Sequence, residues 1–360
     1  MGNKPHKAAE AKENVPTRTK EESKNGVDRR DKEGNGWTKE NGDVETIEEI
    51  GSMIEYRYEN VDCIGRGPYG MVYRAKIIYD GTRTGPKFVA VKLVHIGIHS
   101  PNATDPDTWM TAVKRLRVLT KLAHENLVVY HKVSIFKALG GTAVELAMEY
   151  HNGDLTSFLT GTRKHLLNSW GNVFRFAIDI TRGVEFLHRN GITHGNLKPE
   201  NVLLSISQSG SEKLVIGDSD DLLQMVHSTN SSRCNLRVHG TTRYMSPEML
   251  RKYFQWDEQP PGRETDVWSL GCIILEIAET MKREPTKRLV INGVIKDVTS
   301  GLDNSMFAFL IIEGYVPFVS GNITQNLAGI IRQCLDRNSE KRLSAVKILH
   351  WLQTKEDYYF

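Results

Sequence analysis

Three glycines near residue 67 are the first residues whose spacing suggests a chemistry. They are Gly65, Gly67 and Gly70, and glycines spaced in this way let backbone N–H groups approach a phosphate closely. The same pattern is equally typical of a plain glycine-rich hairpin turn. A dinucleotide-binding fold would need a helix directly after the glycines, whereas residues 71–75 read as a strand. The Gly-Lys-Ser/Thr ending of a Walker A loop is also absent from this segment.

The four cysteines predict neither a metal site nor a disulfide framework. Cys63, Cys234, Cys272 and Cys334 are far apart and form no Cys-x-x-Cys pair. We therefore expect a reducing, cytoplasmic compartment, and the first residues lack the apolar segment of a secretory signal. The sequence contains no run of about 18 or more apolar residues, so it predicts no membrane-spanning helix.

The composition is that of a globular protein preceded by a charged tail. Of 360 residues, 39% are hydrophobic and 25% are charged, with 47 basic against 44 acidic side chains. Nucleic acid is not an expected partner, because the basic residues form no stripe interleaved with aromatics. Residues 1–50 carry 10 basic and 12 acidic residues and no periodic apolar pattern. We expect a disordered tail there, followed by a folded domain over residues 56–352.

Strand patterns come first in this domain and helical patterns follow. Runs rich in β-branched and aromatic residues lie at 56–64, 71–79, 87–94, 127–136 and 141–150. A helical pattern at 109–122 interrupts them, and after residue 152 the apolar residues recur mostly at helical spacing. This order predicts an α+β chain of two unequal lobes, with an antiparallel sheet at about 56–148 and helices at about 152–352.

Five further motifs follow the glycines in a fixed order. They are Val89-Ala90-Val91-Lys92, Thr193-His194-Gly195-Asn196-Leu197-Lys198-Pro199-Glu200-Asn201, Gly217-Asp218-Ser219-Asp220, Gly240-Thr241-Thr242-Arg243-Tyr244-Met245-Ser246-Pro247-Glu248 and Asp266-Val267-Trp268-Ser269-Leu270-Gly271. With this set the chain resembles a eukaryotic protein kinase of the Ser/Thr type over nearly all of its length except the tail. The resemblance implies a bilobal fold, with one main helix beside the sheet of the small lobe, and with ATP and Mg²⁺ held between the lobes.

The resemblance also assigns a role to each matching position. Val72 and Ala90 would cover the adenine and Leu203 would lie beneath it, while Lys92 would pair with the α- and β-phosphates. The positions expected to bind the nucleotide are Ile64, Gly65, Gly67, Tyr69, Gly70, Val72, Ala90, Lys92, Met148, Glu149, Tyr150 and Leu203. Residues 148–151 would form the hinge, whose backbone hydrogen bonds to adenine. Asn201 and Asp218 would hold Mg²⁺. Taken alone, Lys92 would be an exposed strand lysine and Asp218 an ordinary turn aspartate.

Departures from the kinase pattern bear on catalysis. Asn196 stands where the family has the aspartate that accepts the proton of the substrate hydroxyl. An amide has no basic lone pair at neutral pH, and a positioned general base is worth typically ~10²–10⁴-fold in rate. No catalytic base is therefore intact, although Lys198 is retained. Gly195 replaces the arginine that reads activation-loop phosphorylation in the family.

Three more departures concern the active-state geometry and the metal position. Counting nine residues back from His124 reaches Arg115 where the family has the glutamate partner of the lysine, and residues 108–123 contain no acidic residue. A cation there would repel Lys92. Ser219 replaces a phenylalanine and cannot supply its apolar contact. Asp220, in place of a glycine, is either an exposed turn carboxylate or a substitute metal ligand.

Other family positions that support the fold are retained. Ser246-Pro247-Glu248 and Arg342 match a buried ion pair that braces the helical lobe, and Asp266 matches the residue that holds the backbone of the catalytic loop. The resemblance thus implies a stable kinase fold with damaged chemistry.

These features predict a cytoplasmic pseudokinase that holds ATP and regulates or scaffolds a signalling protein, for example an active kinase. The alternative is a weakly active Ser/Thr kinase in which Asp218 or Asp220 compensates. A third interpretation, drawn from Arg115 and Ser219, is that no nucleotide binds. Neither the identity of the partner nor the oligomeric state follows from the sequence. The segment 255–262 is a candidate contact site, with a buried packing role for Trp256 as the alternative.

Overall fold

The computed structural model describes the greater part of the chain. The described residues are 46–51, 57–67, 70–78, 85, 87–96, 118, 120–138, 141–206, 212–217, 242–254, 262–282, 288–297 and 304–356. All of them belong to one structural unit, which runs from Gly36 to Phe360.

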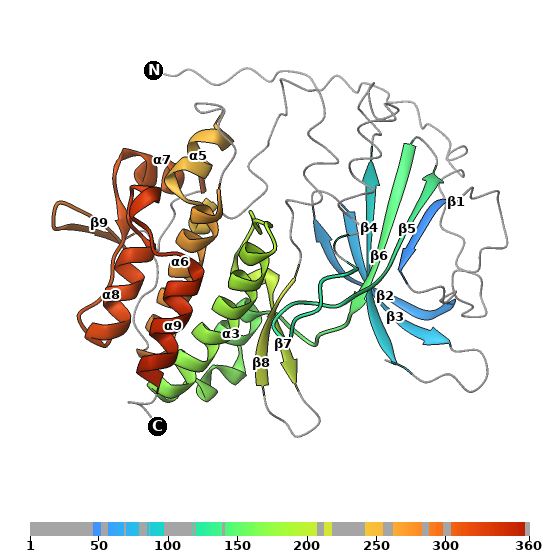
Figure 1. Ribbon diagram of the computed structural model, residues 1–360, viewed down its shortest axis with the longest axis horizontal. Helices are drawn as coiled ribbons and strands as arrows, with labels where there is room; N and C mark the ends of the chain where they lie inside the picture. Colours follow the sequence, from blue (N-terminus) through green and yellow to red (C-terminus); the bar gives the residue numbers. More distant parts are fainter. Residues whose placement is uncertain are drawn as a thin grey trace, which may run out of the picture. The chain divides into compact units, whose positions relative to one another are not determined.

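A six-stranded antiparallel sheet forms the N-terminal part of this unit, in the order β1-β5-β6-β4-β3-β2 (Figure 1). The strands are β1 (Thr46–Gly51), β2 (Arg57–Gly67), β3 (Gly70–Ile78), β4 (Phe88–Ile96), β5 (Tyr130–Ala138) and β6 (Gly141–Glu149). The predicted meander is confirmed, because β2 pairs with β3 and β3 pairs with β4. Both predicted later strands are present as β5 and β6. Most of the helix predicted at 109–122 lies outside the described residues.

Strand β1 corrects the predicted end of the charged tail. Residues 46–50 were assigned to the tail, but they pair antiparallel with β5, with Ile50 opposite Val133. An open strand edge supplies backbone partners even to a charged segment, so pairing outweighs composition here. Residues 1–45 lie outside the described residues.

The C-terminal part is mostly helical, as predicted. Its main helices are α2 (Leu155–Thr160), α3 (Trp170–Arg189), α5 (Pro247–Tyr253), α6 (Arg263–Lys282), α7 (Asn304–Glu313), α8 (Gln325–Cys334) and α9 (Ala345–Glu356). Short 3₁₀ turns are η1 (Thr162–Leu166), η2 (Pro199–Asn201), η3 (Thr242–Tyr244) and η4 (Ser339–Lys341). Helices α3 and α6 pack together around a large apolar core that includes Trp268 (Figure 1). Among the described helices, none has the length and apolar character needed to cross a membrane.

Two small sheets accompany the helices. Strands β7 (Val202–Ile206) and β8 (Glu212–Ile216) form a hairpin directly after the predicted catalytic loop. Strands β9 (Arg288–Ile291), β10 (Val294–Asp297) and β11 (Val316–Pro317) form a second sheet, which the sequence reasoning missed. The sequence carried a signal for this hairpin, because the pair Asn292-Gly293 lies between two runs rich in β-branched residues. In the structure both residues adopt positive φ. Such an Asn-Gly pair is typical of a tight hairpin.

A buried joint connects β8 to helix α3 and to the segment that leads into β5. The backbone N–H of Ile216 donates to the carbonyl of Asn126 at 2.8 Å, and that of Val128 donates to Ile216 at 2.9 Å. The Asn126 amide donates to the Leu214 carbonyl, and the Leu214 N–H donates to the carboxylate of Asp179 on α3. Burial raises the pKa of Asp179. These contacts fix β8, and with it the chain leading to Gly217.

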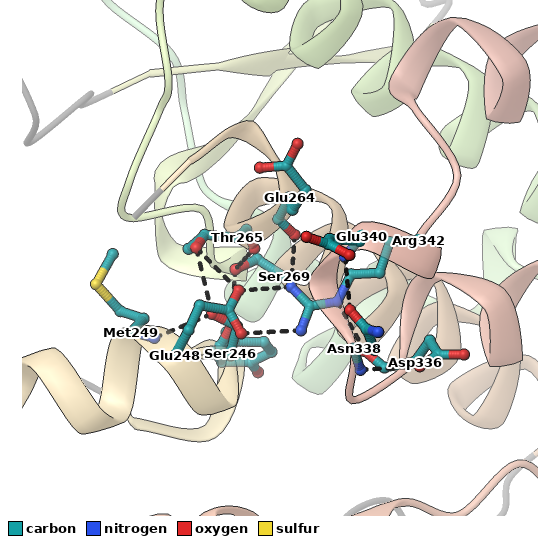
Figure 2. Close-up of polar contacts among 11 residues, drawn as sticks. Ser246, Glu248, Met249, Glu264, Thr265, Ser269, Asp336, Asn338, Glu340 and Arg342 are labelled. Carbon is teal, nitrogen blue, oxygen red and sulfur yellow. Dashed lines mark hydrogen bonds and ion pairs between the residues drawn. The ribbon is translucent and has the colours of Figure 1, made fainter. Parts of the chain in front are cut away.

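The predicted ion pair braces the helical part (Figure 2). Arg342 is fully buried and donates to both carboxylate oxygens of Glu248, at 2.6 and 2.9 Å. Its remaining donors reach the carbonyls of Glu264 and Asp336, both at 2.8 Å. Ser246 accepts from the backbone N–H of Met249 and caps helix α5. Helix α5, the start of α6 and the turn before α9 are therefore joined through one guanidinium group.

The electrostatics of Glu248 agree with this arrangement. Burial alone would raise the pKa of its carboxyl group, but the hydrogen bond and charge of Arg342 outweigh burial and lower that pKa. Glu248 is therefore ionised near neutral pH, and the pair carries two opposite charges inside the protein.

We expect Glu248→Ala to destabilise the domain by roughly 3 kcal/mol or more, because it leaves a buried guanidinium without its carboxylate. Chemical denaturation of the full chain measures this change. Glu340→Ala removes an exposed carboxylate near the same turn and should change the free energy of unfolding by less than about 0.5 kcal/mol. Equal stability of the two variants would contradict a bracing role for Glu248.

Candidate nucleotide site and catalytic loop

The residues predicted to enclose adenine lie in one hydrophobic cluster. Ala90 on β4 is the direct cross-strand partner of Met148 on β6, and both are buried. Val72 on β3 and Leu203 on β7 are half-buried and pack against the same cluster. Strands from the large sheet and from the β7–β8 hairpin thus bring these four side chains together, as the resemblance implied.

Lys92 lies in the middle of the sheet and not at its surface. It pairs with Val72 on one side and Leu146 on the other, and only 7% of its surface is exposed. The interpretation of Lys92 as an exposed strand lysine is therefore wrong. A buried ammonium group requires polar partners. Lys92 lies on β4, two residues after Ala90 of the cluster predicted to enclose adenine.

The glycine motif forms the hairpin that joins β2 to β3. Gly65 pairs with Val72, and Gly67 pairs with Gly70. A Cβ atom on Gly70 would overlap the backbone carbonyl of Leu93, so sheet packing alone already requires glycine there. Ile64 is exposed, and Tyr69 lies outside the described residues. The expected phosphate contacts of Gly65 and Gly67 stay a prediction.

The predicted hinge continues directly from β6. The backbone N–H of Glu149 donates to the carbonyl of Val129 at 2.9 Å, which ties the end of the strand to the segment before β5. Tyr150 is half-buried and packs against the adenine cluster. The guanidinium of Arg74 lies 5.7 Å from the centre of its ring. The hinge is therefore held by contacts to the sheet on both of its sides.

Asp266 holds the predicted catalytic loop by its backbone, as the resemblance implied. Its buried carboxylate accepts from the N–H groups of His194 at 2.7 Å and Gly195 at 2.8 Å. The imidazole of His188, at the end of α3, donates to the same carboxylate at 2.8 Å. The sequence reasoning missed His188, because a single histidine on a mostly apolar helix gives no spacing signal.

Asn196 occupies a loop that is fixed on both sides. Its backbone carbonyl accepts from the side-chain amide of Asn201 at 2.8 Å, and its N–H lies 3.3 Å from Nδ1 of His194. His194 donates through Nε2 to the carbonyl of Gly217, the residue before Asp218. The frame of the catalytic loop is thus complete, and it presents an amide where the family has a carboxylate.

The predicted metal site stays a prediction, because only one of its two residues, Asn201, is among the described residues. Because the Asn201 nitrogen is occupied by the loop carbonyl, its amide oxygen is the atom available to a cation, and Mg²⁺ prefers oxygen ligands. Asp218, Ser219 and Asp220 lie outside the described residues, as does Arg115. Within the described ranges, no group of three or more His, Cys, Asp or Glu side chains is arranged to hold a metal.

A small hollow lies beside Asn196 and Lys198. The residues that line it are Gly195, Asn196, Leu197, Lys198, Tyr244, Met245, Met249, Thr265 and Ser269. Ser269 donates to the carbonyl of Tyr244 at 2.7 Å, which joins helix α6 to the turn that closes the hollow. The described residues that line the hollow include no carboxylate and no imidazole.

Gly195 has a backbone reason for being glycine in this chain. Its φ angle is +75°, and its N–H is held by Asp266. A residue with a side chain pays about 1–2 kcal/mol in the left-handed region. Glycine adopts this conformation without that cost.

We expect Gly195→Ala to lower the free energy of unfolding by about 1–2 kcal/mol, because a Cβ atom is unfavourable at this φ. Gly329→Ala is the matched control, since Gly329 lies inside helix α8 with open space around its Cα. That control should stabilise the helix by up to about 1 kcal/mol. Urea denaturation of both full-length variants tests the difference in sign, and stabilisation by Gly195→Ala would refute the strain argument.

Comparison with known proteins agrees with this geometry. A family model described as "Protein kinase domain" matches residues 58–352. The mitogen-activated protein kinase kinase kinase 19 of Homo sapiens is 26% identical over 296 residues, which cover 80% of this chain and 19% of that protein. The serine/threonine-protein kinase SSK22 of Saccharomyces cerevisiae is 26% identical over 313 residues, covering 83% and 21% respectively.

A Caenorhabditis elegans protein described as a cyclin-dependent kinase 4 homolog is 29% identical over 219 residues, which cover 60% of this chain and 48% of that protein. This chain thus spans less than half the length of each of these relatives. The family match nevertheless covers the sheet from residue 58 onward, the cluster predicted to enclose adenine, the catalytic loop and the helical brace. The chain therefore belongs to the protein kinase domain family.

Proposed function

We propose that this protein is a pseudokinase, which retains a nucleotide pocket and acts by binding and regulating a signalling protein. The observation that carries the proposal is Asn196, at the position of the catalytic base, in a loop whose backbone contacts are otherwise complete. The defect is thus chemical and local, because it replaces the proton acceptor and leaves the loop in its place.

The surroundings of Asn196 support weak or absent phosphoryl transfer. The anchors at Asp266 and Asn201 limit how far the loop can move to bring in another base. The nearby cation, Lys198, is not a proton acceptor while charged. A chain without a base at this position loses about 10²–10⁴-fold in rate, before any cost from Arg115 and Ser219 is added.

The adenine cluster and Lys92 support nucleotide binding. Apolar surface for the adenine ring would come from Val72, Ala90, Met148 and Leu203. Lys92, the cross-strand partner of Val72, supplies a positive charge beside them. The oxygen atoms of Asn201 and Asp218 would hold Mg²⁺, which would neutralise phosphate charge when bound. Nucleotide bound in this way would regulate a partner only through its different affinity for two conformations of the chain.

An active protein kinase is the partner that we propose. Two of the relatives, from Homo sapiens and Mus musculus, are named as mitogen-activated protein kinase kinase kinases. A chain with a kinase fold but without efficient phosphoryl transfer can bind an active kinase, or compete with it for its binding partners, through its surface alone. Cys63, Cys272 and Cys334 are free thiols, which agrees with the proposed cytoplasmic location.

Nucleotide binding should raise the thermal stability of the full chain, because a ligand that binds only the folded state stabilises it. At 100 times Kd, ATP with Mg²⁺ should add about 2.7 kcal/mol. Lys92→Ala should lose most of this gain. Lys87→Ala removes an exposed lysine next to the same strand and should keep it. Absence of any shift at saturating ATP would refute nucleotide binding and leave a purely structural scaffold.

Phosphoryl transfer separates the pseudokinase from the weakly active kinase. We expect the wild-type chain to phosphorylate itself and a general Ser/Thr protein substrate no faster than Asp218→Ala does. That variant removes the expected metal ligand. A wild-type rate clearly above Asp218→Ala would establish the enzyme instead. Asn196→Asp restores the carboxylate, and the size of any gain measures how much of the defect comes from the missing base alone.

A further inference from the structure

Two hinge side chains face each other on one side of the segment that would bind adenine. Glu149 ends strand β6, and His151 follows two residues later. Nε2 of His151 lies 3.6 Å from a carboxylate oxygen of Glu149. The His151 side chain is only 3% exposed, whereas that of Glu149 is 43% exposed. The intervening Tyr150 packs against the adenine cluster. The pair therefore bridges the hinge across Tyr150.

The contact is incomplete in a way that a proton would change. Nε2 of His151 is buried and makes no hydrogen bond to any described residue, and 3.6 Å is longer than a hydrogen bond. A buried polar atom without a partner is costly. A protonated imidazole carries N–H groups on both nitrogens, so protonation gives Nε2 a hydrogen to donate to the Glu149 carboxylate and adds an opposite charge.

The other charged groups that face this pair come from neighbouring strands. Glu149 is faced by His131 on β5 and by Lys213 on β8 as well as by His151. The contact with His151 lowers the pKa of Glu149 against the opposing effect of burial, and the charges of His131 and Lys213 lower it further. The Glu149 carboxyl group is therefore ionised throughout the range in which histidines titrate.

His131 on β5 is a second histidine placed against Glu149. Its Nε2 is also buried without a hydrogen bond to any described residue. Burial lowers the pKa of His131, against the attraction of Glu149. His131 is therefore neutral near physiological pH and takes up a proton only in more acidic solution.

We propose that His151 is a positioning residue, whose buried imidazole pairs with Glu149 when protonated and so couples nucleotide affinity to pH. The inference rests on the proposed nucleotide binding. An imidazolium–carboxylate pair fixes residues 149 and 151 relative to each other, and with them the backbone groups offered to adenine. A hinge that is already ordered loses less conformational entropy on binding, so affinity should rise as pH falls through the range in which histidine gains charge.

The reciprocal effect must also occur. If a proton on His151 favours the nucleotide, binding of the nucleotide favours uptake of that proton by the same factor. Calorimetry of one binding reaction in two buffers of different ionisation enthalpy measures this uptake directly. A merely structural role for His151 would not produce it.

Adenosine is the probe of choice, because it reaches the hinge and has no phosphate that titrates in this range. We expect full-length wild-type protein to bind adenosine roughly 5-fold more tightly at about pH 6 than at about pH 8, a coupling of ordinary size between linked sites. His151→Gln, which keeps a polar side chain of similar length but has no titration, should bind equally at both pH values. Glu149→Gln should also remove the dependence while it leaves the imidazole in place.

Two control variants locate the effect. His350→Gln replaces an exposed histidine on helix α9 and should keep the full pH dependence, and His131→Gln should keep it as well. Loss of the dependence in His131→Gln, with its retention in His151→Gln, would overturn the assignment to His151. Circular dichroism of each variant at both pH values establishes that it is folded.

The remaining outcomes separate this inference from the proposed function. Binding of adenosine with the same pH dependence in wild type and in His151→Gln, or with none in wild type, overturns the proton coupling and leaves nucleotide binding intact. No binding of adenosine or of ATP at any pH overturns both. Equal loss of affinity at the two pH values in Glu149→Gln, with the dependence retained, also overturns the coupling.

Discussion

The buried carboxylate of Asp266 is the contact on which the arrangement of the site depends. Three donors converge on it, from His188 and from the backbone of His194 and Gly195. Because Asp266 lies in the first turn of the buried helix α6, the catalytic loop is positioned by the core of the helical part. The loop then positions Asn196, and through Asn201 and Gly217 it fixes where the following segment begins.

The contacts that remain in this chain are those on which folding depends. Three such contacts each involve a buried charged side chain: Arg342 with Glu248, Asp266 with the loop, and Asp179 with β8. Loss of any of them would leave an unpaired charge or donor. The hydrogen bonds described for this loop use the backbone N–H and carbonyl of Asn196. At Gly195 the positive φ favours glycine.

Much of this structure follows from local patterns, and the parts that do not have identifiable reasons. The strands β2 to β6 and the long helices show clear periodicity, so their positions were predicted correctly. Strand β1 was missed because its pairing with β5 is a tertiary contact that outweighs a charged composition. The β9–β10 hairpin was missed although Asn292-Gly293 signalled it. The structure places Val72, Ala90, Met148 and Leu203 in one apolar cluster, and their contact with adenine stays a prediction. The motifs gave no sign of His188 or of the pair Glu149 and His151, whose relation exists only in three dimensions.

The cluster predicted to enclose adenine shows why fold and function must be tested separately here. Ala90 and Met148 are buried in the same cluster as Val94, Val133 and Ile135, so these side chains are also part of the core of the sheet. A chain that had lost nucleotide binding would still need these apolar side chains to fold. Their presence is thus weaker support for a bound nucleotide than the buried cation of Lys92, which apolar packing does not require. The same distinction applies at the hinge. Tyr150 packs against the apolar cluster, whereas Glu149 and His151 make a polar contact beside it, whose role only a binding measurement can test.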